Sequence, residues 1–64
     1  MSLQLAEQFE ANEQYEDAYR EYKEVYEQNP DDLGLLERLG QLSLILDRPD
    51  HAAGYYNEII KRDV

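Results

Sequence analysis

Residues 18–25 read AYREYKEV, and residues 52–59, which lie 34 positions further along the chain, read AAGYYNEI. An alanine opens each segment, a tyrosine stands at its fifth position, and its last residue is the β-branched Val25 or Ile59. A fixed period of this length in a helical sequence indicates stacked structural repeats. The sequence therefore predicts two copies of one structural unit.

The same period continues toward the N-terminal end of each copy. Leu5 corresponds to Leu39 and Ala6 corresponds to Gly40, so each pair keeps a similar size and polarity. Because Gly40 takes the place of a small alanine, we expect two helices to cross closely there. Helical repeats stack on one another and present an extended surface. The pattern therefore favours a binding or assembly module over an enzyme.

The spacing of apolar residues predicts four helices. Within residues 15–28 the apolar positions follow one another at steps of one and three, which is typical of one helix face. In residues 33–46 they go almost all the way round, which indicates a helix covered on more than one side. We expect Asn12 to end the first helix in a left-handed conformation, and Asp31 or Asp32 to cap the third. The predicted helices span residues 3–12, 15–28, 33–46 and 49–62.

The formal net charge of −9 is unevenly distributed. Residues 1–32 carry ten acids and two bases, giving −8, whereas residues 33–64 carry five acids and four bases, giving −1. This charge repels phosphate backbones, so we expect no nucleic-acid ligand. It steers a basic or cationic amphipathic partner toward the first half. A solvated acidic surface, with helical pairs such as Glu16 and Arg20, is the alternative interpretation.

The sequence offers no pattern of reactive groups. It holds no cysteine, so disulfides and thiolate metal sites are excluded. His51 is the only histidine, and we interpret it as a surface residue at a helix start. Ser2 and Ser43 lack a basic partner in sequence range, and the carboxylates do not form a calcium-binding loop. We therefore expect no catalytic residue, no metal ligand and no cofactor.

Membrane insertion is not expected either. No stretch approaches the roughly 18 consecutive apolar residues that indicate a membrane span. No basic segment precedes an apolar run, so we expect no signal peptide. We favour the cytoplasm, although no residue pattern fixes the compartment.

These features resemble the tetratricopeptide repeat, a helix–turn–helix unit of 34 residues. The small residues of that family fall on Ala6 and Ala18 in the first copy. Its large second-helix residue falls on Tyr22, and its closing proline falls on Pro30. The two copies depart from the family pattern at Ser2, Ser43, Pro49 and Val64.

The resemblance implies an all-α fold in which the two units form a short right-handed α-solenoid. We expect the repeats over residues 1–32 and 33–64, which together form a single domain. About three repeats are usually needed for stability. We therefore expect the chain to be a fragment of a longer array or protein, or to self-associate. A generic four-helix bundle is the alternative fold.

In this family the first helix of each pair lines a groove that holds a peptide or a partner helix. The acidic and leucine-rich residues at these positions suit a basic, amphipathic segment. Because carboxylates repel a carboxylate, we expect no clamp for the C-terminal tails of chaperones. The resemblance places the candidate groove at Leu3, Glu7, Glu10, Ala11, Glu37, Arg38, Gln41, Leu44 and Ile45.

Self-association is a second possibility, because each repeat needs neighbours on both of its faces. A second copy of the chain is an alternative cover for Leu44 and Ile45. Packing and interface roles are both open for Tyr19 and Tyr26. A structural spacer and an accessory domain of a larger enzyme are the alternative functions. We expect a homodimer to cover Tyr55, Tyr56, Ile59 and Ile60.

Overall fold

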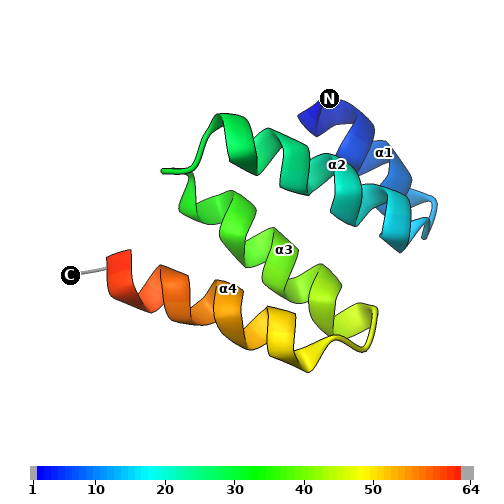
Figure 1. The fold of residues 1–64 in the computed structure, drawn as a ribbon. Helices are drawn as coiled ribbons and strands as arrows, with labels where there is room; N and C mark the ends of the chain where they lie inside the picture. Colours follow the sequence, from blue (N-terminus) through cyan, green and yellow to red (C-terminus); the bar gives the residue numbers. More distant parts are fainter. Residues whose placement is uncertain (1, 63–64) are drawn as a thin grey trace.

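Four α-helices follow one another along residues 2–62, the part of the chain that the computed structural model describes (Figure 1). The helices are α1 (Leu3–Ala11), α2 (Tyr15–Gln28), α3 (Leu33–Ile45) and α4 (Pro49–Arg62). Each helix packs against the next, so α3 lies between α2 and α4 (Figure 1). The predicted all-α fold of two helix–turn–helix units is confirmed, and the described residues contain no strand.

The helix bounds agree closely with the sequence prediction. The bounds of α2 and α4 are confirmed at both ends, whereas α1 and α3 each end one residue earlier than predicted. Such small differences are usual where the last turn of a helix loosens. Val64, a predicted departure from the family pattern, lies outside the described residues, as do Met1 and Asp63.

Short polar side chains begin α1 and α3. The Ser2 hydroxyl accepts a hydrogen bond from the N–H of Leu5 at 3.0 Å. The Asp32 carboxylate accepts one from the N–H of Gly34, also at 3.0 Å. Both bonds satisfy N–H groups that have no partner within the helix. Of the two caps predicted for α3, Asp31 and Asp32, the structure uses Asp32.

The turn between α1 and α2 corrects one expectation. Asn12 has a φ of −93°, so it is not in the left-handed conformation that the sequence suggested. Its N–H still bonds to carbonyls of the last helical turn, which keeps the residue near helical geometry. The left-handed residue is Glu13, one position later, with a φ of 61°.

The two intra-repeat turns share one backbone design. Asp47, which lies 34 positions after Glu13, also has a positive φ, of 59°. In the first turn the N–H of Gln14 donates to the carbonyl of Phe9 at 2.8 Å. In the second, the N–H of Arg48 donates to the equivalent carbonyl, also 34 positions later, at 2.7 Å. This is the Schellman arrangement that satisfies the last carbonyls of a helix. The period in the sequence is thus repeated in the backbone.

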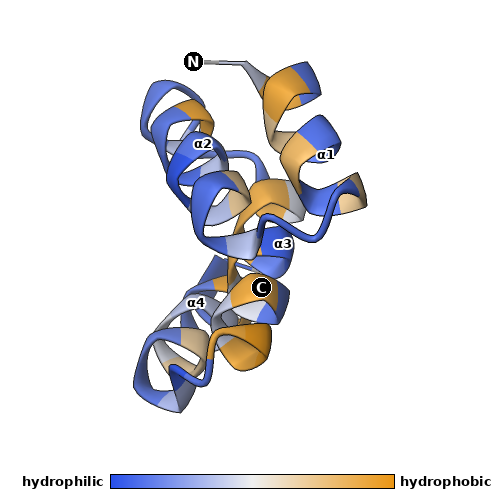
Figure 2. Ribbon diagram, turned by 90° about the vertical axis from the view of Figure 1, so that its right-hand side faces the viewer, coloured by the Kyte–Doolittle hydropathy of each residue, from blue (hydrophilic) through white to orange (hydrophobic). Residues whose placement is uncertain are grey.

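The core lies between the first three helices, and α3 contributes most to it. Figure 2 shows the contrast with α2, whose ribbon is mostly hydrophilic in colour. As predicted, α3 is covered on two sides, and its exposed residues lie on a single face. That face consists of Gly34, Glu37, Arg38, Gln41, Leu44 and Ile45. The main core cluster is Ala6, Ala18, Tyr22, Leu35, Leu39 and Leu42.

The predicted close crossing at Gly40 is present. A Cβ atom at Gly40 would lie 2.8 Å from the Tyr56 ring, so only glycine admits this ring without a shift. Ala52, on the same helix as Tyr56, is 2 % exposed. Ala6 and Ala18, which correspond to Gly40 and Ala52 in the first unit, have no exposed surface. Small residues therefore let the helices of each hairpin approach closely.

An ion pair between the two units replaces one predicted within α2. The Arg48 guanidinium donates to both Glu16 oxygens, at 2.7 and 2.9 Å. It also lies 5.7 Å from the centre of the Tyr19 ring. Arg20, which the spacing of four paired with Glu16, bonds instead to Asp17 at 2.7 Å. Glu16 thus links the second turn to α2, because the stacking of the units brings Arg48 within reach.

Candidate interaction surfaces

Two residues of the predicted groove tie α1 to α3. Glu10 accepts a hydrogen bond from the Arg38 guanidinium at 3.2 Å and another from the Tyr22 hydroxyl at 2.9 Å. The Arg38 guanidinium also lies 5.9 Å from the centre of the Tyr22 ring. The ion pair between Glu10 and Arg38 connects α1 to α3. Because the two charges neutralise each other, the pair leaves little charge for a partner.

The remaining predicted residues are exposed along α1 and α3, and we call the whole predicted set the α1/α3 groove. Leu3, Glu7 and Arg38 line a shallow cleft of about 200 Å³ at the N-terminal ends of these helices. The structure does not bring the other predicted positions into this cleft. Those positions, all exposed except the half-buried Glu10, are Glu10, Ala11, Glu37, Gln41, Leu44 and Ile45.

Large hydrophobic side chains are exposed on this groove. Leu44 is 57 % exposed and Ile45 is 53 % exposed, side by side at the end of α3. Leu3 is 45 % exposed at the other end of the groove. Among the described residues, Ile60 on α4 is a further exposed hydrophobic residue. The groove therefore combines open carboxylates with open apolar side chains.

The residues proposed for self-association have unequal surroundings. Tyr55 packs edge-on against Tyr19, with ring centres 6.3 Å apart, and the two hydroxyls share a hydrogen bond of 2.5 Å. The Tyr56 ring covers Gly40, and Ile59 is half-buried. Ile60 is the exposed member of the set. Much of the aromatic surface is thus used within the chain.

A second cleft, which the sequence did not indicate, lies between α2 and α4. It has a volume of about 420 Å³ and Leu36 of α3 also lines it. Tyr19 and Tyr26, whose roles the sequence left open, lie on its α2 side and contact α4 within the chain. We call it the α2/α4 cleft; its lining residues are Tyr19, Lys23, Tyr26, Leu36, His51, Gly54, Tyr55, Glu58 and Arg62.

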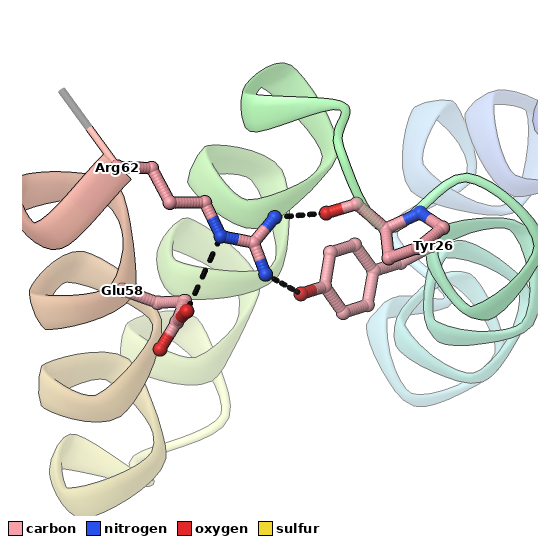
Figure 3. A network of polar contacts seen from close by, with 4 residues as sticks. Tyr26, Glu58 and Arg62 are labelled. Atoms are coloured by element: carbon pink, nitrogen blue, oxygen red, sulfur yellow. Dashed lines mark hydrogen bonds and ion pairs between the residues drawn. The ribbon is translucent and has the colours of Figure 1, made fainter.

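The α2/α4 cleft is bridged at its far end by a network centred on Arg62. Figure 3 shows this side chain reaching from α4 to the Tyr26 hydroxyl and to the Pro30 carbonyl. The distance to the Tyr26 hydroxyl is 3.2 Å. The same guanidinium donates to Glu58 at 3.2 Å. The sequence indicated only the α2 side of this cleft, where Tyr19, Lys23 and Tyr26 follow one another at helical steps of four and three.

The family model described as the tetratricopeptide repeat matches residues 1–42. The chain belongs to the tetratricopeptide-repeat family. The match spans the first unit and most of α3. Comparison with curated proteins and with solved structures gave no match. Tetratricopeptide repeats are generally protein–protein interaction modules and are typically non-catalytic.

Two tyrosines of this tetratricopeptide-repeat protein have altered acidity. Burial, and then the hydrogen bond to Glu10, raise the pKa of Tyr22 to about 12. Burial, and then the hydrogen bond with Tyr19, raise the pKa of Tyr55 above its usual value. A neutral phenol is favoured where a charged one would lose solvation. Both hydroxyls therefore stay protonated at neutral pH and act as structural donors and acceptors.

The other polar groups that the sequence singled out have structural positions in the repeat. Ser43 is fully buried, and its hydroxyl donates to the Leu39 carbonyl at 2.8 Å, which confirms that it packs within α3. His51 is exposed on the first turn of α4, at the edge of the α2/α4 cleft. Over residues 2–62, no three histidine or acidic side chains lie together as a metal site would need. Each helix in that range is too short or too polar to cross a bilayer.

Proposed function

We propose that the α1/α3 groove binds a basic, amphipathic helix or peptide of a partner protein. The observation that carries the proposal is the exposure of Leu44 and Ile45, 57 % and 53 %, on the same face of α3 as Glu37. A soluble protein gains nothing in stability from two adjacent open hydrophobic side chains, which are typical of interaction sites. Membership of a family of protein-binding repeats supports a role for this face in binding a partner.

The charge of the groove supports a basic partner. Its nine residues include three carboxylates and one guanidinium, giving a net charge of −2. The pair formed by Glu10 and Arg38 cancels, so the open charges belong to Glu7 and Glu37. An amphipathic segment with lysine or arginine beside leucine-like residues complements this surface. A partner that ends in a free carboxylate would meet repulsion.

Charge reversal tests this assignment. We expect a fluorescein-labelled model helix of alternating leucine and lysine blocks to bind the chain, as measured by fluorescence anisotropy. Glu37→Lys should weaken binding about fivefold, because a surface charge pair contributes on the order of 1 kcal/mol. Leu44→Ser should weaken it through loss of apolar contact.

The matched control is Glu27→Lys, which changes the net charge equally at an exposed position of α2 outside the groove. We expect it to change the affinity less than twofold in the same buffer. Equal loss of affinity in both charge reversals would mean that the peptide responds to overall charge and has no site at the groove.

Self-association is a second candidate function, favoured by Ile60. This side chain is 68 % exposed on α4, where the next repeat of an array would pack. A homodimer that buries it should appear in sedimentation equilibrium at tens of micromolar and dissociate in Ile60→Lys. A wild-type chain that stays monomeric at that concentration would rule this candidate out.

A further inference from the structure

Gly54 is a residue that the fold itself does not require. It lies exposed within α4, and a Cβ atom built there would meet no atom within 4 Å outside its immediate surroundings. Glycine is among the weakest helix formers, so alanine at this position would stabilise the folded chain in the absence of a ligand. Gly40, in contrast, is needed by the Tyr56 ring that covers it. The open space at Gly54 belongs to the α2/α4 cleft.

Side-chain contacts connect α2 and α4 beside the open cleft around Gly54. One is the hydrogen bond between the Tyr19 and Tyr55 hydroxyls. Another is the reach of Arg62 to the Tyr26 hydroxyl, seen in Figure 3. The two contacts connect the helices on which the lining residues stand.

The lining between these contacts is aromatic, and its charged groups are Lys23, Arg62 and Glu58, one oxygen of which accepts a hydrogen bond from Arg62. Leu36, only 1 % exposed, contributes an apolar side chain to the lining. Lys23 belongs to α2, and Glu58 belongs to α4. The three donors of a lysine suit a peptide carbonyl, and a carboxylate suits a peptide N–H. The volume of about 420 Å³ falls in the usual range for ligand sites.

We propose that the α2/α4 cleft binds an extended, uncharged peptide segment that inserts one bulky apolar side chain toward Leu36. The absence of a Cβ at Gly54 lets the peptide backbone approach α4, while Lys23 and Glu58 bind its carbonyl and N–H groups. A strongly basic segment would be repelled by Lys23 and Arg62, and a strongly acidic one by the Glu58 carboxylate. This site shares no residue with the α1/α3 groove, so it is independent of the function proposed above.

A selection experiment tests the proposal on the full chain. A phage-displayed random peptide library is selected on the wild type and counter-selected on Gly54→Ala, and enriched peptides are synthesised with a fluorophore. We expect sequences with one leucine, methionine or phenylalanine between uncharged residues. Gly54→Ala should weaken their binding about tenfold, a typical effect of one misplaced methyl group, while raising the thermal midpoint of unfolding.

Asn57→Ala is the matched control, because Asn57 is exposed on α4 but does not line the cleft. It should also raise the thermal midpoint, yet leave peptide affinity unchanged. The proposal is overturned if no enriched peptide depends on Gly54, or if the enriched peptides lose binding in Glu37→Lys and keep it in Gly54→Ala. The second result would place them in the α1/α3 groove instead.

Discussion

Tyr22 and Tyr56 occupy the same position in the two units, 34 residues apart, yet their surroundings differ. Tyr22 is 2 % exposed, and its hydroxyl donates to Glu10. Tyr56 is half-buried, with its ring over Gly40, and the residue that corresponds to Glu10 is Leu44, whose apolar side chain cannot accept a hydrogen bond. The same residue at the same place in the repeat is therefore held by different forces.

The difference follows from the number of neighbours. The backbone of α2 packs against both α1 and α3, whereas that of α4 packs against α3 alone. Tyr26 on α2 is half-buried, and its counterpart on α4, Ile60, is 68 % exposed. In stacked repeats, stability is close to a sum of the units and their interfaces. Burial at a given position is thus set by the adjoining helix as much as by the residue itself.

The largest expected effect is the removal of each tyrosine ring. Tyr22→Ala should lower the free energy of unfolding by about 3–5 kcal/mol, because it empties a fully buried site. Tyr56→Ala should cost roughly half as much, since its ring is already partly in water. Urea denaturation followed by circular dichroism measures both. Equal losses would show that the two positions are equivalent, against the comparison drawn from their exposure.

Next in size is the close crossing in the second hairpin. Gly40→Val should destabilise the fold by about 2 kcal/mol, because its side chain must displace the Tyr56 ring. In a Tyr56→Leu background the same substitution should cost clearly less. A double-mutant cycle by denaturation measures the coupling between the two positions. Independent, additive effects would mean that the ring does not pack on the glycine.

The hydroxyl groups separate the two tyrosines more finely. Tyr22→Phe should cost about 1.5 kcal/mol, because it removes a hydrogen bond to a carboxylate. Tyr56→Phe should be nearly neutral, since the Tyr56 hydroxyl has no hydrogen bond over residues 2–62. Denaturation at neutral pH compares the two variants. A loss in Tyr56→Phe that matches the loss in Tyr22→Phe would contradict this assignment.

High pH provides a second measurement on the same pair of variants. The pKa of Tyr22 rises from 10.0 to about 12 on folding, so the unfolded chain releases this proton first. Stability from this group is complete below pH 10 and falls as the pH rises toward 12. Tyr22→Phe should make the fall shallower, with Tyr55 still contributing because its pKa is also raised. If the free energy of unfolding depended on pH in the same way in Tyr22→Phe and in the wild type, the Tyr22 hydroxyl would not cause the loss of stability at high pH.

The sequence predicted the helices well because their ends are marked locally. Pro30 and Asp32 separate α2 from α3, and the period of 34 fixes the equivalent turns. Contacts between the units were not predictable in this way. Glu16 has suitable partners on its own helix, and only the placement of the second turn decides that it binds Arg48. Local spacing therefore gives the elements but not their cross-contacts.

The two candidate surfaces likewise differ in how far the sequence predicts them. The resemblance to known repeats named the α1/α3 groove, and the structure adds that Glu10 and Arg38 are paired within it. The α2/α4 cleft depends on how far apart two helices lie that are not adjacent in the chain. Periodicity along one helix carries no information on that distance. Gly54 was visible in the sequence, but its open surroundings were not.

The smallest expected effect concerns the turns, where the two units are alike. Glu13 and Asp47 both adopt positive φ, a conformation that costs a residue with a side chain but not glycine. Glu13→Gly and Asp47→Gly should each stabilise the fold, by about 0.5 kcal/mol once the greater freedom of the unfolded chain is included. Thermal unfolding measures both changes. Opposite signs for the two substitutions would argue against a shared turn geometry.

Native-state hydrogen exchange tests the central comparison most directly, because it reports the opening of each helix separately. The segments to compare are residues 18–25 of α2 and 52–59 of α4, which correspond under the repeat. We predict that amides in 18–25 exchange only when the whole chain unfolds. Those in 52–59 should exchange through local opening, at a free energy lower by about 1 kcal/mol or more, because the backbone of α4 packs against α3 alone. Equal protection of both segments would contradict the account.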